Sequence, residues 1–342
     1  MKKQKKIALI TGIKGQDAAF LSKFLLEKNY SVIGVDVDKS KQSNWRLNEL
    51  GVKSSISLKQ LDLSNFNKIY KLLEKTRPDE IYNLGAKTFV KKSFDQPLVT
   101  SDTNAMGCLR LLESTRLLNL KSKFYQASSS EMFGRDKAMK KKLNEKSAFN
   151  PLSPYAVSKI FAHYITTQYR ESYKIFACSG ILFNHESSFR GEEFVTRKIV
   201  KNACLLKKQQ INSFNLGNIN SYRDWGYAGD YVEAMWKMLQ YKKADDYVIA
   251  TGKTYSVKYL LELVFNLIGI KYKIVNNKNS LNYIDSKGNI IVKTFYKEDT
   301  RPSDLTYLIG NPQKAMKILK WKPKTNFKEL IKSMIKDELK RI

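Results

Sequence analysis

Apolar runs of strand length alternate with helical patterns along the first part of the chain. The first run begins at Ile7, and a glycine turn over residues 11–18 leads into a helix and a second strand ending in Asp36. Further apolar segments follow at 55–61, 80–84, 123–127, 175–183 and 247–250, with helical patterns at 65–75, 99–118 and 155–173. Strands that alternate with helices predict a parallel, doubly wound α/β sheet.

The turn after the first strand has the layout that places a dinucleotide pyrophosphate on a helix N-terminus. Gly12 permits a tight turn, Gly15 lets backbone N–H groups approach phosphate, and Ala18 stands where a third glycine is usual. An alternative is that the glycines serve the turn alone. Within the βα pattern, the turn favours a Rossmann-type nucleotide-binding sheet.

The alternation weakens from about residue 184. Helical patterns remain at 194–207 and 256–267, and the polar segment 276–299 contains a hairpin-turn sequence at 285–289. A chain of 342 residues is also long for one hydrophobic core. We predict two closely packed domains. The dinucleotide-binding domain covers 1–183 and 224–252, and a smaller, mixed α/β substrate domain covers 184–223 and 253–342.

The composition, with 42% hydrophobic and 27% charged residues, is that of a folded protein. No run approaches the ~18 apolar residues of a membrane span. Cys108, Cys178 and Cys204 are an odd number at unrelated spacings, which favours neither a disulfide framework nor a metal site. We expect a cytoplasmic protein with no membrane partner and no metal.

The net charge of +29 would suit a nucleic-acid partner. The lysines are spread over the whole chain, however, and the only dense run after the N-terminus covers residues 137–142. We therefore expect a solvated basic surface with no specific nucleic-acid partner. Such a surface also attracts small anions such as a nucleotide diphosphate.

Candidate catalytic groups lie around the fifth predicted strand and the next helix. Tyr155 and Lys159 are four residues apart, so they share a helix face, and a nearby ammonium group would lower the pKa of the phenol toward that of a useful base. Ser129 and Glu131 follow the strand at the sheet edge where ligands bind. Their hydroxyl and carboxylate can bind a sugar hydroxyl and take a carbon-bound proton. The alternatives are that the Tyr/Lys spacing arises by chance and that Glu131 lies in a solvated polar loop.

Together, the Thr11-Gly12-x-x-Gly15 turn, Ser129 and the Tyr155-x-x-x-Lys159 pair resemble the extended short-chain dehydrogenase/reductases. Motifs between about residues 7 and 323 narrow the resemblance to the GDP-mannose 4,6-dehydratase family. These motifs are Gln16-Asp17, Trp45-Arg46-Leu47, Asn184-His185-Glu186-Ser187, Arg190-Gly191-Glu192, residues 194–198, Arg223-Asp224-Trp225-Gly226 and Arg301-Pro302.

The resemblance implies a redox-neutral lyase reaction that removes water from GDP-mannose. It assigns Tyr155 as the base at the C4 hydroxyl, Lys159 as its electrostatic partner and Glu131 as the group that removes the C5 proton. Ser129 replaces the usual threonine as the hydroxyl partner of the reacting oxygen. The implied substrate-binding residues are Ser130, Asn184, Glu186, Val195, Lys198, Arg223, Arg301 and Asp304. In a chain this basic, solvated surface charge remains an alternative for the basic residues among them.

The resemblance also implies a tightly bound nicotinamide dinucleotide. Its contacts are Tyr155, Lys159, Gly12, Gly15, Gln16, Asp17, Asp36, Asp62, Leu84 and Ala86. Asp36 departs from the family, which usually carries arginines there and uses NADP. Because a carboxylate binds ribose hydroxyls and repels a 2′-phosphate, we predict NAD. Asp62 either contacts adenine or is an exposed loop residue.

Other readings stay open. Lys87 and Phe89 replace the family's usual glutamine and histidine near the cofactor and sugar, so another GDP-sugar, such as a GDP-heptose, is an alternative substrate. Epimerisation or 4-oxidation of such a sugar is an alternative reaction, and a non-catalytic, nucleic-acid-binding dinucleotide sensor is an alternative class. Relatives in the family lead us to expect a homodimer or homotetramer.

Overall fold

The computed structural model describes residues 5–37, 44–134, 141–277, 280–295 and 305–342. Its centre is a seven-stranded sheet in the order β11-β6-β5-β4-β1-β2-β3, in which every neighbouring pair is parallel. The strands are β1 (Ile7–Thr11), β2 (Ser31–Asp36), β3 (Ile56–Gln60), β4 (Glu80–Asn83), β5 (Lys123–Ser129), β6 (Ala177–Leu182) and β11 (Tyr247–Ile249). All seven correspond to the predicted apolar segments, so the doubly wound Rossmann-type sheet is confirmed.

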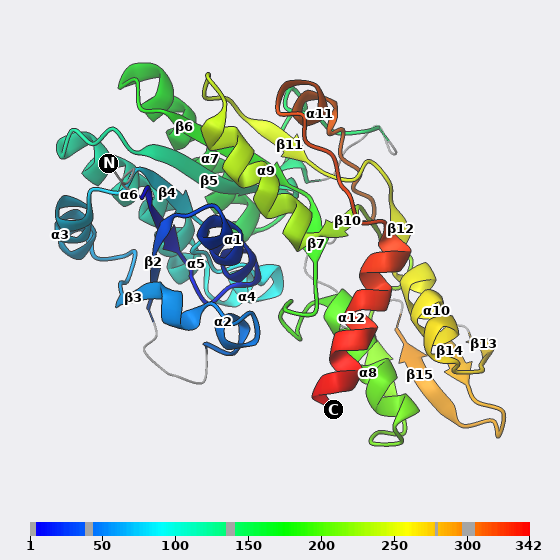
Figure 1. Cartoon of the computed structure of the whole chain (residues 1–342). Coiled ribbons are helices and arrows are strands. Elements are labelled where there is room, and N and C mark those ends of the chain that lie inside the picture. The colour runs from blue at the N-terminus through cyan, green and yellow to red at the C-terminus, as the bar shows by residue number, and fades with distance from the viewer. Residues whose placement is uncertain (1–4, 38–43, 135–140, 278–279, 296–304) are drawn as a thin grey trace.

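Helices cover both faces of this sheet (Figure 1). On one face, α1 (Gln16–Glu27) packs beside α9 (Ala228–Gln240), and Ala8 and Ile10 of β1 point into that layer. Leu9 points to the other face, which α3 (Phe66–Thr76), α6 (Gly107–Leu117) and α7 (Pro154–Ser172) cover. Strand residues therefore alternate between two apolar layers, which explains why these strands read as continuous apolar runs.

Short helices surround the carboxyl edge of the sheet. They are α2 (Trp45–Glu49), α4 (Val90–Asp95), α5 (Pro97–Ser101) and the one-turn 3-10 helix Ser130–Phe133. A π-helical turn, Asp102–Met106, joins α5 to α6. The predicted continuous helix over 99–118 is therefore divided at this turn.

A second hydrophobic core lies beside the sheet (Figure 1). It is built from α8 (Val195–Lys207), α10 (Val257–Ile268), α12 (Phe327–Arg341) and a small mixed sheet in the order β13-β14-β15-β8. The strands are β13 (Lys273–Asn277), β14 (Ser280–Ile284), β15 (Ile290–Thr294) and β8 (Phe214–Leu216). The predicted hairpin turn is confirmed, since Asp285 Oδ1 accepts from the backbone N–H groups of Lys287 and Asn289 at 2.8 and 2.9 Å.

Two short strand pairs join the large sheet to this second core. β7 (Asn184–Glu186) pairs in parallel with β10 (Trp225–Tyr227), and β9 (Tyr222–Arg223) pairs antiparallel with β12 (Tyr255–Ser256). The last described helix before α12 is α11 (Gln313–Ile318). No helix within the described ranges is long and apolar enough to cross a membrane.

Candidate active site

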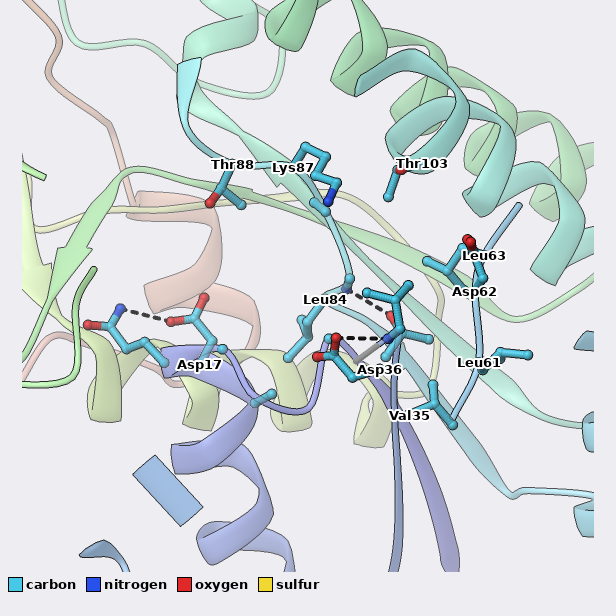
Figure 2. Close-up of a pocket in the computed structure, with 18 of the residues that line it drawn as sticks. Asp17, Val35, Asp36, Leu61, Asp62, Leu63, Leu84, Lys87, Thr88 and Thr103 are labelled. Carbon is cyan, nitrogen blue, oxygen red and sulfur yellow. Dashed lines mark hydrogen bonds between the residues drawn. The ribbon is translucent and has the colours of Figure 1, made fainter. Parts of the chain in front are cut away.

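A pocket of about 420 Å³ opens at the carboxyl ends of β1, β2, β3 and β4 (Figure 2). Eight residues predicted to bind the dinucleotide line it. They are Gly12, Gly15, Gln16, Asp17, Asp36, Asp62, Leu84 and Ala86. The structure thus brings together side chains and backbone from four separate βα connections, which is the place where an open parallel sheet binds its ligands.

The glycine turn forms one wall of this pocket. Gly12 has a φ of +66°, and a Cβ there would lie 2.7 Å from the Cα of Gly85. Gly15 is the N-cap of α1, and its N–H donates to the Gly12 carbonyl at 2.9 Å. No side chain caps this helix end. A backbone cradle that side chains would fill, below an uncapped helix N-terminus, fits the diphosphate of a dinucleotide.

Asp36 lies in the wall of the same pocket, where β2 ends. Its Oδ1 accepts from Val37 N at 2.9 Å and its Oδ2 from Lys14 N at 3.3 Å. These bonds hold the carboxylate at the pocket wall. Asp62 is exposed, and its Oδ1 accepts from Ser64 N at 2.9 Å, so it caps the start of its loop while lining the pocket.

The candidate catalytic groups gather where β5 ends. Ser129 caps the 3-10 turn by accepting from the Glu131 N–H at 3.2 Å. Tyr155, on the first turn of α7, is only 7% exposed. Burial raises the pKa of Tyr155 to about 12, a hydrogen bond with Ser129 opposes the rise, and the Glu131 carboxylate adds to it. Ser129, Glu131 and Tyr155 are therefore close enough to share one substrate.

Lys159 does not lower the pKa of Tyr155 in the structure as predicted. Its Nζ donates to the Ala127 carbonyl at 2.8 Å and lies 5.9 Å from the centroid of the Tyr155 ring. Burial lowers the pKa of Lys159 to about 8. The expected fall in the pKa of Tyr155 is thus wrong for this structure, because desolvation of the phenol outweighs its neighbours and the ammonium group is bound to a backbone carbonyl.

The predicted substrate residues lie outside the pocket walls. Ser130, Asn184, Glu186, Val195, Lys198 and Arg223 are described, and none of these six lines the 420 Å³ pocket. Arg301 and Asp304 lie outside the described residues.

These six residues lie on four elements. Ser130 is buried in the 3-10 turn, Asn184 belongs to β7, and Arg223 belongs to β9, where it donates to the Tyr222 carbonyl at 2.9 Å. Val195 and Lys198 are on the first turn of α8. The start of α8 approaches the loop after β4, since the rings of Phe194 and Phe89 lie 6.0 Å apart.

Glu186 has partners inside the protein. Its side chain is 2% exposed, Thr196 Oγ1 donates to its Oε2 at 2.5 Å, and Arg190 Nε lies 3.3 Å from the same oxygen. The carboxylate thus joins β7 to the start of α8.

Some residues of the pocket were not among the predicted dinucleotide contacts, although Lys87 was expected to lie near the cofactor and sugar. Arg190, Lys87, Thr88 and Thr103 all line the pocket. Figure 2 shows Lys87 and Thr88 on the segment after Leu84, with Thr103 on the neighbouring helix. Arg190 stacks on the Phe194 ring, 3.7 Å from its centroid. Two features of the sequence could have indicated such pocket residues. They are the family-like Arg190-Gly191-Glu192 motif and the unusual lysine at position 87.

Comparison with known proteins shows which protein family this chain matches. The family model described as GDP-mannose 4,6 dehydratase matches residues 9–334. The GDP-mannose 4,6 dehydratase of Dictyostelium discoideum is 43% identical, with 100% of this chain and 98% of that protein covered.

Solved structures share the fold. RMD from Pseudomonas aeruginosa complexed with NADPH superposes with a TM-score of 0.79 at 19% identity, covering 99% of this chain and 100% of that one. A Thermus thermophilus UDP-glucose 4-epimerase complex with NAD gives 0.80 at 22% identity, covering 98% and 99%.

Proposed function

The chain belongs to the GDP-mannose 4,6-dehydratase family, and from that premise we propose that it removes water from GDP-mannose to give GDP-4-keto-6-deoxymannose. One observation carries the proposal beyond the family match. A carboxylate, Glu131, lies beside the buried Tyr155 and Ser129 at the sheet edge that holds the dinucleotide pocket. Epimerases and reductases of this fold need only the hydroxyl, phenol and amine, whereas elimination also needs an acid–base group at C5 and C6.

The residues have separate tasks in this proposal. Tyr155 accepts the proton of the C4 hydroxyl, and Ser129 hydrogen-bonds the same oxygen. Once C4 is a ketone, the C5 proton is acidic, so Glu131 removes it and passes it to the C6 hydroxyl, which leaves as water. After C6 is reduced, the proton that Tyr155 took from the C4 hydroxyl returns to C5. A nicotinamide dinucleotide, when bound, would accept the hydride from C4 and return it to C6, so each cycle would regenerate it and it could stay bound between turnovers.

We propose NAD as that dinucleotide. Gly12 and Gly15 would hold its diphosphate, and Leu84, Ala86 and Asp62 would line the rest of its path. Asp36 supports the choice of NAD, because its carboxylate at the end of β2 suits two ribose hydroxyls and repels a 2′-phosphate.

The guanosine diphosphate end of the substrate would lie against the second domain, residues 184–223 and 253–342. Asn184, Val195, Lys198 and Arg223 are the described candidates there, and an arginine fork suits a diphosphate because it donates in pairs. For Arg301 and Asp304 the resemblance in sequence is the only support. The cytoplasmic location stays a prediction from the cysteine content.

We also propose that the chain forms at least a homodimer. α5 and α7 pack together and present an apolar outer surface made of Leu98, Val157, Phe161 and Tyr164, which are 83%, 55%, 40% and 55% exposed. Contiguous exposed apolar side chains on a folded protein mark an interaction surface. A second copy of the same surface would bury them.

Incubation with GDP-mannose, with and without added NAD, tests the proposed reaction. We expect a 4-keto-6-deoxy product without net accumulation of NADH. A product that keeps its 6-hydroxyl group would identify an epimerase, and steady NADH release would identify a 4-oxidase; either result contradicts dehydration.

A further inference from the structure

The first turn of α1 is bonded directly to the segment that follows β6. Gln16 Nε2 donates to the His185 carbonyl at 3.1 Å, and Ser187 Oγ donates to Gln16 Oε1 at 2.7 Å. His185 Nε2 lies 2.7 Å from Asp17 Oδ2, and Gln16 Nε2 also donates to Asp17 Oδ1 at 3.1 Å. Figure 2 shows Asp17 beside the pocket with one of these bonds drawn. Both carboxylate oxygens of Asp17 therefore already have partners in the protein.

The contacts of His185 define its protonation. Nδ1 lies 2.7 Å from the Phe183 carbonyl, which can only accept, and Nε2 faces the Asp17 carboxylate. When Asp17 is ionised, both ring nitrogens donate, which is the hydrogen-bond pattern of an imidazolium. Burial favours the neutral ring, but Asp17 outweighs it and raises the pKa of His185. His185 and Arg190, in turn, overcome burial to lower the pKa of Asp17.

Two further side chains flank this ion pair. The His185 ring stacks on Tyr231 of α9 at a centroid distance of 4.7 Å, and Arg190 lies on the pocket side. His185 is also the central residue of β7, opposite Gly226 of β10. The ion pair therefore fixes a strand, and not only a loop, against the start of α1.

The two elements joined in this way have different tasks under the proposed function, on which this inference rests. The α1 turn holds the dinucleotide, whereas β7 and the residues after it carry Asn184 and Arg190. We propose that Gln16, Asp17, His185 and Ser187 are positioning residues that hold the substrate segment 184–190 in register with the dinucleotide turn. Asp17 then acts through His185 and not as a ligand of the dinucleotide. Correct alignment of the two bound molecules is what hydride transfer requires.

The test compares Asp17→Asn, His185→Gln and the double variant in the NAD-loaded enzyme. We expect each single change to raise the KM for GDP-mannose or lower kcat by about tenfold, a typical size for coupling between sites. The double variant should be no worse than either single one, because both remove the same bond. The Kd for NADH should stay within about twofold, since the glycine turn itself is unchanged.

A matched control is Asp246→Asn. Asp246 is a similarly buried carboxylate, paired with Arg170 Nη2 at 2.8 Å near the start of β11, away from the pocket residues. We expect this change to lower thermal stability without changing the KM for GDP-mannose. His185→Gln keeps a polar side chain but removes the ring charge and its ion pair with Asp17, so it is the variant to use if Asp17→Asn fails to fold.

The pH dependence separates a positioning role from simple packing. The groups facing His185 are Asp17, Arg190 and Tyr231. Because the pKa of His185 is raised, the ion pair is complete at lower pH and is lost as the pH rises through that value. We expect the KM for GDP-mannose to rise over that pH range in the wild type. In His185→Gln this rise should be absent.

Three results would overturn the inference. The first is a loss of NADH affinity in Asp17→Asn alone, which would make Asp17 a ligand of the dinucleotide. The second is that the effects of the two single changes add in the double variant. The third is that both single variants have the kinetics of the wild type. Failure of the proposed function is distinguishable, since it would appear in the wild type as a product other than the 4-keto-6-deoxy sugar.

Discussion

Tyr155 and Lys159 are the residues whose protonation matters most for the proposed reaction. Burial raises the pKa of Tyr155 to about 12 and lowers that of Lys159 to about 8. At neutral pH the phenol is therefore protonated and the amine is charged. The reactive form, with phenolate and ammonium together, is a small fraction whose population depends on both groups.

The pH profile of kcat/KM follows from these two values. Below pH about 8 the phenolate fraction rises tenfold per pH unit while Lys159 stays charged, so kcat/KM should rise with unit slope. Above that pH the loss of ammonium cancels the gain, and the profile should become flat. In Lys159→Met the break should vanish. A wild-type profile that keeps rising through this pH would contradict the assignment.

Glu131 is the residue that distinguishes dehydration from the other reactions of this fold. Glu131→Gln keeps the size and the backbone bond to Ser129 but removes the base, so the overall rate should fall by a factor of about 100 or more. The first half-reaction should survive, because it uses Tyr155. Absorbance of reduced cofactor in single-turnover experiments measures it. Unchanged turnover would remove Glu131 from the mechanism.

Asp36 controls the choice of dinucleotide in our proposal. NAD should bind the wild type at least about tenfold more tightly than NADP, and Asp36→Ala should remove most of that preference. Fluorescence titration with NADH and NADPH measures both constants. Asp62→Ala is the matched control, because Asp62 lines the same pocket at a different strand end and should not change the ratio. A wild type that prefers NADP would contradict the role of Asp36.

At the scale of elements, features set by local sequence patterns could be predicted, whereas features set by long-range contacts could not. All seven strands of the large sheet, α3, α7, α8, α10 and the hairpin at 285–289 follow from apolar periodicity and turn residues, which act locally. The short strands β7, β8, β9 and β10 are two or three residues long and pair with segments far along the chain, so no local pattern marks them. The glycine wall of the pocket was predictable from one turn, whereas the partners of Glu186 and Lys159 depend on packing.

The glycine turn gives a prediction at this scale. Gly12→Ala should lower the free energy of unfolding by about 3 kcal/mol, from the positive φ of +66° and the contact with Gly85. It should also weaken NADH binding. Gly51→Ala is the control, since Gly51 has a φ of +68° and nothing within 4 Å of the added Cβ, so it should cost about 1 kcal/mol. If denaturant unfolding gave the same loss in the free energy of unfolding for Gly12→Ala and Gly51→Ala, this would contradict the close approach to Gly85.

At the scale of the whole molecule, single polar groups join parts that are distant in sequence. Asp224 accepts from Thr251 N, Gly252 N and Gly310 N at 2.9, 2.9 and 3.2 Å, which ties the link between the two cores to the end of β11. Arg341, at the end of α12, binds Glu49 of α2 at 2.6 Å and the Ser188 carbonyl at 2.8 Å. The sequence places these residues in different segments, so only the folded chain reveals that they hold the two cores together.

The apolar surface on α5 and α7 predicts how whole molecules associate. Phe161→Glu would place a charge at the centre of the buried contact, and a charge without a partner there costs several kcal/mol, so we expect the assembly to dissociate to monomers. Light scattering coupled to size-exclusion chromatography measures the mass. Met316→Glu is the control, because Met316 is similarly exposed, at 44% against 40%, but lies on α11. A wild-type monomer, or a Phe161→Glu oligomer of unchanged mass, would contradict this surface as the interface.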